Sequence, residues 1–242
     1  MRPEHPDVKD IPALRQLWQE AFGDPESYLD LFFSTAFFVD HCLCIRDGGT
    51  IAAAAYWLDC QMENQPVAYL YAVATAKAAR GRGMCRALMK GIHALLQAQG
   101  YGCAILVPGD DPLRQMYRTM GYADFGGIQE CICPAGDFPA ELQSINAKEF
   151  AVLRRKLLPD GGVMQEGAQL DLLAGIAEFY RGDGFLLTRR KEDGFVLELL
   201  GQMPTALGEN SVHMRTVGEK PFGMFYPLNG NCVPSYFVFA FD

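Results

Sequence analysis

Two arginines and two glycines alternate in the loop Arg80-Gly81-Arg82-Gly83, between an expected strand and an expected helix. Apolar residues over Ala68–Thr75 predict the strand, and an apolar stripe at helical spacing from Met84 onward predicts the helix. A helix start attracts anions because its backbone N–H groups are free and its peptide dipoles are aligned. Glycines let a phosphate approach those groups, and guanidinium groups add charge and forked donors. The loop is therefore predicted to bind phosphate.

The spacing of the glycines and charged residues in the loop distinguishes it from two common phosphate-binding motifs. No Gly-Lys-Ser/Thr follows a four-residue gap, and Arg86 stands where a dinucleotide loop has a small residue. The run Arg80-Gly81-Arg82-Gly83-Met84-Cys85 instead resembles the Arg/Gln-x-x-Gly-x-Gly/Ala signature of the GNAT N-acetyltransferase superfamily, with Cys85 in place of Gly or Ala. The resemblance implies that the loop holds the pyrophosphate of acetyl-CoA.

The chain after the loop supports this resemblance. The helix from Met84 is expected to end at Gly100, and a strand is expected over Cys103–Val107. Asp111 is expected to be the N-cap of a short helix, with Pro112 at its first position. The run Tyr117-Arg118-Thr119-Met120-Gly121-Tyr122 resembles the Tyr-x-x-x-Gly-Phe/Tyr ending of the same superfamily. The resemblance implies an α+β protein with the GNAT acyltransferase fold, a mixed, splayed central sheet flanked by helices.

The resemblance also implies roles for residues of both motifs. The backbone of Val73–Thr75 would pair with the pantetheine arm, and an N–H of that strand would face the thioester oxygen. Tyr117 would protonate the departing thiolate as general acid. Without the resemblance, Tyr117 would be a core tyrosine on the helix face of Leu113 and Met116. The implied cofactor-binding residues are Val73, Ala74, Thr75, Arg80, Gly81, Arg82, Gly83, Met84, Cys85 and Arg86.

The general base does not follow from the two motifs. Many superfamily members carry a glutamate on the strand before the loop, but Ala68–Thr75 contains no acid. Asp59 and Glu63 lie upstream and would act through water, or they are plain turn residues. The loop, the tyrosine ending and an added second half also resemble Eis-type tandem proteins, in which the C-terminal carboxylate is the base. That resemblance implies a catalytic role for Asp242.

The composition of the chain argues against two classes of protein, nucleic-acid-binding and membrane-spanning proteins. The net charge of −8 argues against a nucleic-acid partner, since such binding depends on Lys and Arg at the phosphates. No apolar run approaches the ~20 residues of a membrane span, and the N-terminus lacks the apolar core of a signal peptide. A soluble, cytoplasmic protein without a membrane partner is expected. The eight cysteines are expected to be reduced and mostly buried, and neither they nor the four histidines show metal-ligand spacing.

Pro134, Gly136 and Pro139 predict a linker. We expect a GNAT acetyltransferase domain over residues 1–135 and a second, partial GNAT-like half over residues 140–242. In that half, a helix with a capping box is expected after Asn146, followed by another helix over Leu172–Tyr180. A hairpin and further strands follow, the last of them over Tyr236–Phe241, which repeats the element order of the first part. This half lacks the arginine-glycine signature and is not expected to bind CoA.

These expectations describe an acetyl-CoA-dependent N-acetyltransferase that acts on a primary amine of a small molecule or peptide. Two alternatives stay open at this point. One is a CoA-binding regulatory module without catalysis. The other is a transferase that uses an aminoacylated carrier, against which the acidic charge counts if the carrier is RNA. A homo-oligomer is compatible with each of these functions.

Overall fold

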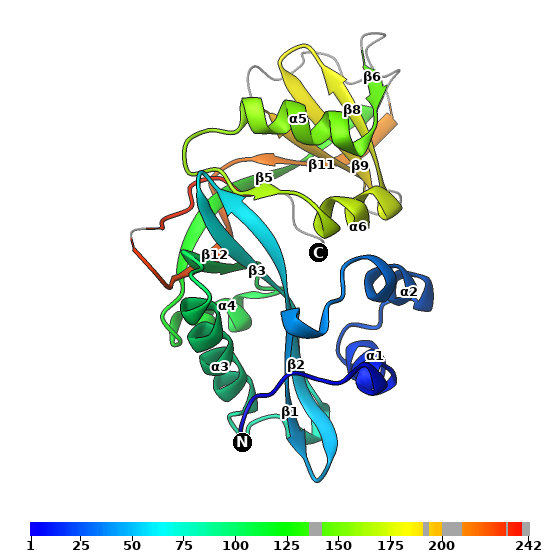
Figure 1. Cartoon of the computed structure of the whole chain (residues 1–242). Coiled ribbons are helices and arrows are strands. Elements are labelled where there is room, and N and C mark those ends of the chain that lie inside the picture. The colour runs from blue at the N-terminus through cyan, green and yellow to red at the C-terminus, as the bar shows by residue number, and fades with distance from the viewer. Residues whose placement is uncertain (136–141, 191–193, 200–209, 231, 239–242) are drawn as a thin grey trace. The chain divides into compact units, whose positions relative to one another are not determined.

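Figure 1 presents a computed structural model of the chain, which describes residues 1–135, 142–190, 194–199, 210–230 and 232–238. The chain forms two compact units that interleave along the sequence. The first unit comprises Met1–Cys60, Gln65–Leu106 and Tyr226–Cys232. The second unit comprises Gln61–Asn64, Val107–Phe225 and Val233–Asp242. The predicted division into 1–135 and 140–242 stays a prediction.

The first unit is built on a sheet with the strand order β1-β2-β3-β4. Strands β1 (Cys42–Asp47) and β2 (Thr50–Met62) are antiparallel, and the turn between them carries two glycines. Strand β3 (Gln65–Thr75) follows β2 along the chain, and the short β4 (Cys103–Leu106) runs parallel to β3. The helices of this unit are α1 (Ile11–Phe22), α2 (Glu26–Thr35) and α3 (Met84–Ala98), with 3-10 turns at Val8–Asp10, Val39–His41 and Lys77–Ala79.

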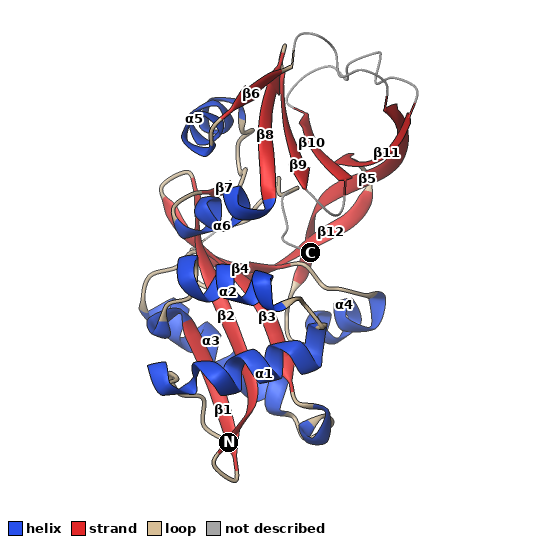
Figure 2. Ribbon diagram, turned by 90° about the vertical axis from the view of Figure 1, so that its right-hand side faces the viewer, coloured by secondary structure: helices blue, strands red, loops and turns tan. Residues whose placement is uncertain are grey.

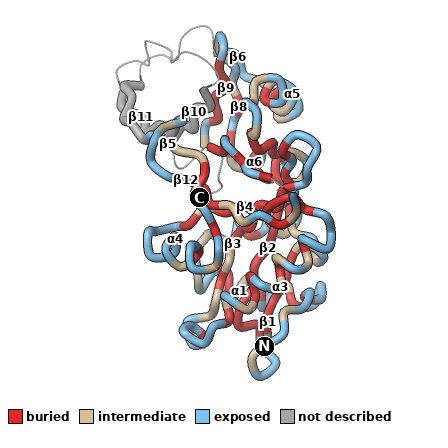
Figure 3. Tube along the Cα trace, turned by 90° about the vertical axis from the view of Figure 1, so that its left-hand side faces the viewer, coloured by how far each residue is buried: buried red, intermediate tan, exposed pale blue. Residues whose placement is uncertain are grey.

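Helices cover both faces of this sheet, with α1 and α2 on one side and α3 on the other (Figures 1 and 2). Trp18 of α1 is the centre of the first side, with ring centroids 4.6 Å from Phe32, 5.2 Å from Tyr56 and 5.6 Å from Tyr71. Large aromatic rings bury much apolar surface and pack at such offset angles. The resulting buried strands are the red segments of β2 and β3 in Figure 3.

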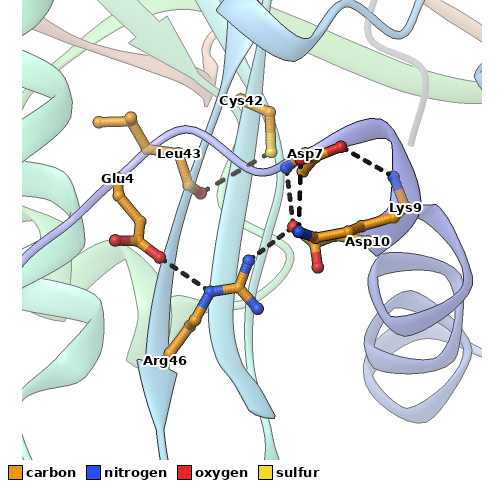
Figure 4. A network of polar contacts seen from close by, with 7 residues as sticks. All are labelled: Glu4, Asp7, Lys9, Asp10, Cys42, Leu43 and Arg46. Carbon is orange, nitrogen blue, oxygen red and sulfur yellow. Dashed lines mark hydrogen bonds and ion pairs between the residues drawn. The ribbon is translucent and has the colours of Figure 1, made fainter. Parts of the chain in front are cut away.

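The N-terminal segment is fastened to β1 by charged side chains (Figure 4). Arg46 Nε donates to Glu4 Oε1 over 2.8 Å, and Arg46 Nη2 donates to Asp10 Oδ2 over 2.6 Å. Asp10 also accepts the backbone N–H of Asp7 over 2.7 Å, which closes a capping box. The Arg46 guanidinium holds the pKa of Asp10 below its usual range, so this carboxylate stays charged although the residue is buried.

The second unit contains a sheet with the order β12-β5-β11-β10-β9-β8-β6. Neighbouring strands with described registers are antiparallel except β10 and β11, which are parallel. The strands are β5 (Ala123–Ala135), β6 (Gln143–Ile145), β8 (Ala177–Gly182), β9 (Phe185–Arg190), β10 (Gly194–Leu199), β11 (Asn210–Val217) and β12 (Lys220–Pro227). The remaining elements are α4 (Asp111–Arg118), α5 (Ala147–Leu157), β7 (Met164–Gln165) and α6 (Ala168–Ile176).

Two predictions for the second half are corrected. The helix expected over Leu172–Tyr180 ends at Ile176, because the next residues form β8 and pair with both β6 and β9. Phe179 of β8 then packs against Phe150 of α5 at 4.5 Å. The strand expected near Tyr236 is reduced to one bridge between Gly162 and Tyr236, and residues 239–241 lie outside the described part. The capping box at Asn146 is confirmed, with Glu149 as its partner.

The described helices include none that is long and apolar enough to cross a membrane.

Candidate active site

The loop between β3 and α3 has the backbone expected of an anion cradle. Gly81 and Gly83 both adopt left-handed conformations, with φ angles of 75° and 77°. Residues with a side chain rarely adopt this conformation. Apart from the adjacent residues, no heavy atom lies within 4 Å of where a Cβ would sit at either glycine. Gly83 is the N-cap of α3 and no side chain caps this helix start. The first amides of α3 are therefore not covered by a side-chain cap, which suits a bound phosphate.

Two of the loop arginines are held by partners in the first unit. Arg80 Nε donates to the carbonyl oxygen of Thr75 over 3.2 Å, which links the loop to the end of β3. Arg82 donates from Nη1 and Nη2 to the two carboxylate oxygens of Asp47, over 2.5 Å and 3.3 Å. The Arg82 guanidinium lowers the pKa of Asp47. Arg86 lies in the first turn of α3 and is exposed.

The end of β3 is open along one edge and distorted. Strand β3 pairs with β4 over Val67–Tyr69 and then runs on to Thr75, past the end of that pairing. Within this extension Ala72 has a φ of 48°, a left-handed conformation that is rare outside glycine. Such a distortion turns backbone N–H and C=O groups away from a regular ladder and recurs near functional sites. The strand end predicted to meet the thioester thus has an irregular backbone.

Tyr117 lies in α4, in the second unit. It is 5% exposed, and its ring meets Tyr122 at 5.5 Å in a T-shaped arrangement. The backbone around it is tightly turned, since Tyr117 O accepts the N–H groups of Met120 and Tyr122 over 2.9 Å and 3.2 Å. Helix α4 is anchored by Arg114, whose Nη1 donates to Asp124 over 2.5 Å. The ring is therefore held in place.

The helix cap predicted at Asp111 is one residue off. Asp110 is the N-cap, because its carboxylate accepts the N–H of Leu113 over 2.7 Å, and Asp111 is the first residue of α4.

The residues that the sequence offered as general bases lie outside the stretch from the end of β3 to the start of α3. Asp59 accepts a hydrogen bond from Tyr101 Oη over 2.6 Å and lies 3.8 Å from His41 Nε2. Glu63 is a turn residue between β2 and β3 with a φ of 53°. Asp242 lies outside the described residues, so its catalytic role stays a prediction.

Cys85 fills the last position of the loop signature as a partly buried side chain. Burial raises the pKa of this thiol, so it is protonated at neutral pH. The structure therefore gives Cys85 none of the thiolate character that a cysteine nucleophile needs. Within the described part of the chain, no cluster of three or more His, Cys, Asp or Glu could hold a metal ion.

The predicted residues separate into two groups in the structure. Val73–Thr75 and Arg80–Arg86 lie in one continuous stretch of the first unit, and Tyr117 belongs to the second. Two features escaped sequence reasoning. Asp47, the partner of Arg82, is the last residue of β1 and precedes Arg82 by 35 residues in the sequence. The conformation of Ala72 has no signal in the sequence.

The loop, the strand end and the helix start lie on a mixed sheet flanked by helices, as the predicted fold requires. The chain belongs to the GNAT acetyltransferases, since a family model described as "Acetyltransferase (GNAT) domain" matches residues 4–124, half of its 242 residues. The family predicted from the two motifs is thereby confirmed. No curated protein matches the chain in sequence.

Solved structures confirm the fold at low sequence identity. A GCN5-related N-acetyltransferase from Anabaena variabilis is 17% identical with a TM-score of 0.68, and the match covers 94% of this chain and 73% of that one. A GCN5-related N-acetyltransferase from Kribbella flavida is 16% identical with a TM-score of 0.67, covering 94% and 71%. Eis1 from Mycobacterium abscessus is 10% identical with a TM-score of 0.65, covering 94% and 73%. The predicted GNAT fold with a second, partial half is thus confirmed, and these structures share it over most of the chain.

Proposed function

We propose that this chain is an acetyl-CoA-dependent N-acetyltransferase that transfers an acetyl group to a primary amine of a small molecule or peptide. The observation that carries the proposal is the stretch from β3 to α3. An open, distorted strand end, two left-handed glycines and a helix start without a side-chain cap follow one another there. Membership of the GNAT acetyltransferases supports the same reaction class.

The loop fits the pyrophosphate of CoA in shape and charge. Gly81 and Gly83 leave the space above their Cα atoms empty, so phosphate oxygens can reach the first amides of α3. Arg80 and Arg82 contribute guanidinium groups whose charge persists at all working pH values. Arg86 adds a third cation in the first turn. The loop would thus neutralise most of the diphosphate charge.

The strand end would position the thioester. The backbone of Val73–Thr75 would pair with the amides of the pantetheine arm, because β4 does not pair with this part of β3. An N–H near Ala72 would face the thioester oxygen and stabilise the charge that develops on it. Holding both reactants in this way supplies a large share of the rate acceleration, on the order of 7–11 kcal/mol in favourable cases.

Tyr117 would donate a proton to the departing thiolate. A phenol can act as general acid in this step, and groups in that role contribute roughly 10²–10⁴-fold to the rate. The amine must reach the thioester unprotonated, so turnover should rise with pH until the amine is neutral. The acceptor is accordingly a primary amine with access to the end of β3.

The experiment measures CoA affinity by calorimetry and thiol release with a panel of amines. The wild-type chain should bind CoA, and Tyr117→Phe should keep this affinity while kcat falls about 100-fold. The matched control is Tyr122→Phe, which removes a hydroxyl from the neighbouring buried ring. No CoA uptake by the wild type would reject the function. Equal turnover of Tyr117→Phe and the wild type would reject only the acid role.

A further inference from the structure

Two cysteines far apart in the chain bring their sulfur atoms together in the first unit. Cys232 Sγ lies 3.0 Å from Cys103 Sγ, although 129 residues separate them. Cys103 is 0% exposed and Cys232 is 1% exposed, so no solvent lies between the two thiols. A disulfide has sulfur atoms about 2.05 Å apart, so the bond needs an approach of only about 1 Å.

The segment around Cys232 is held against the start of β4 by its backbone. The carbonyl oxygen of Gly102 accepts the N–H groups of Leu228 and Asn229 over 2.9 Å and 3.0 Å. Asn229 Nδ2 donates to the carbonyl oxygens of Gln97 and Tyr101, each over 2.9 Å. Two of these bonds join backbone groups and two come from the Asn229 side chain, so none of them depends on the thiols.

Gly102 makes the close approach of the sulfur atoms feasible. A Cβ at this position would lie 2.9 Å from Cys232 Sγ and 3.0 Å from Cys232 Cβ. The absence of a side chain at residue 102 therefore leaves the space that the second thiol occupies. The two sulfur atoms are thus brought together by hydrogen bonds of the neighbouring residues and by the space that Gly102 leaves.

The chemical state of the pair favours slow exchange. The contact with Cys232 and burial raise the pKa of Cys103, and the nearby Cys60 adds to the effect. Thiols with raised pKa values carry little thiolate at neutral pH, and thiolate is the attacking species in disulfide exchange. Bond formation is therefore expected while the segment docks during folding, and it is slow in the folded chain.

We propose that Cys103 and Cys232 are a redox-modification site, at which a low-molecular-weight disulfide such as oxidised glutathione forms a reversible intramolecular disulfide. One S–S bond forms between the two cysteines and the S–S bond of oxidised glutathione breaks. Two molecules of reduced glutathione leave with the two thiol protons. The two cysteines carry no disulfide in the structure, which therefore shows the reduced state of this site.

The bond would close a loop that contains the chain segment Val107–Phe225, which is the main part of the second unit. Cross-linking residues so far apart restricts the unfolded chain strongly. Under mildly denaturing conditions, Tyr226–Cys232 should therefore stay bound to the rest of the first unit in the oxidised protein and detach in the reduced protein.

The test refolds the full chain from denaturant in buffers of oxidised and reduced glutathione, and it then maps disulfides by peptide mass spectrometry. The expected product has a mass lower by about 2 Da, one Cys103–Cys232 cross-link, and a Tm higher than that of the reduced protein by about 5–15 °C. The Cys232→Ser variant should show neither change. If that variant does not fold, peptide mapping of the wild type decides by itself.

The matched control is Cys60→Ala, which removes the third thiol near Cys103 and leaves the pair intact. This variant should form the same cross-link as the wild type. A Cys60–Cys103 cross-link in the wild type would overturn the pairing. Alkylation of both Cys103 and Cys232 after refolding under oxidising conditions would overturn the site. Neither outcome depends on CoA binding or turnover, so this test is independent of the proposed function.

Discussion

The guanidinium group of Arg82, in the loop between β3 and α3, is paired with both carboxylate oxygens of Asp47, the last residue of β1. Both side chains are about half exposed, at 51% and 44%. Such a pair contributes little to stability in water but places an acidic group beside the loop that we propose binds phosphate. Asp47 thus competes with any phosphate that approaches Arg82.

Replacement of Asp47 should strengthen CoA binding. Asp47→Asn removes a negative charge near the loop and leaves Arg82 charged, so Kd for CoA should fall about 2–5-fold at low ionic strength. The gain should disappear near 1 M salt, where exposed charges are screened. Calorimetry at two salt concentrations measures both effects. Asp40→Asn, an exposed acid outside the loop, serves as control and should leave Kd unchanged. Weaker binding by Asp47→Asn would mean that Asp47 orients Arg82 instead of competing for it.

The backbone at Ala72 should reject branched side chains. At a φ of 48°, a β-branched residue clashes with its own backbone, so Ala72→Val should lower the free energy of unfolding by about 1–3 kcal/mol. Ala72→Gly relieves strain but adds freedom to the unfolded chain, and its change should stay within about 1 kcal/mol. Urea unfolding of the two variants provides the comparison. Equal stabilities would show that residue 72 is regular in solution.

Gly91 of α3 should be coupled energetically to Pro3. A Cβ at Gly91 would lie 2.6 Å from Pro3 Cγ and 2.9 Å from Pro3 Cβ. Alanine inside a helix is worth about 1 kcal/mol over glycine, but Gly91→Ala must displace the proline, so its net effect on unfolding should be near zero. In a variant that already carries Pro3→Gly, the Gly91→Ala substitution should raise the free energy of unfolding by the full amount of about 1 kcal/mol.

A double-mutant cycle therefore should give a coupling free energy of about 1 kcal/mol between positions 3 and 91. The cycle cancels the separate effect of proline on the unfolded chain. Strict additivity of the two substitutions would contradict the contact.

The network around Arg46 should make stability depend on acid pH. Because the folded pKa of Asp10 is lowered, its stabilisation is present above the unfolded value of 3.8 and is lost as pH falls through the folded value. Arg46→Met should cost about 1–3 kcal/mol at pH 7, since it removes hydrogen bonds to charged groups. The difference from the wild type should shrink below about pH 4.

Denaturant unfolding between pH 3 and pH 7 measures this difference directly. Lys9→Met is the matched control, because Lys9 pairs with Asp7 on the exposed surface and should change stability by less than about 1 kcal/mol. A pH-independent cost of Arg46→Met would assign its role to packing.

Local patterns in the sequence predicted most of the elements. The stripe after Met84 predicted α3, and the capping box at Asn146 predicted α5. Both depend on neighbours within a few residues, which is the range over which helix periodicity and capping act. The prediction over Leu172–Tyr180 was wrong at its end, because strand pairing with β6 and β9 depends on residues far along the chain.

The family could be predicted from the residues alone, and so could the loop proposed to hold a diphosphate, because the signature and its helix start lie within one short stretch. Three relations became visible only in the folded chain: Asp47 pairs with Arg82, Ala72 departs from regular strand conformation, and Cys103 contacts Cys232. Those relations join residues up to 129 positions apart, or they depend on a strand end that its neighbour does not pair. Neither condition leaves a periodic trace in the residues themselves, since each arises from how distant segments pack.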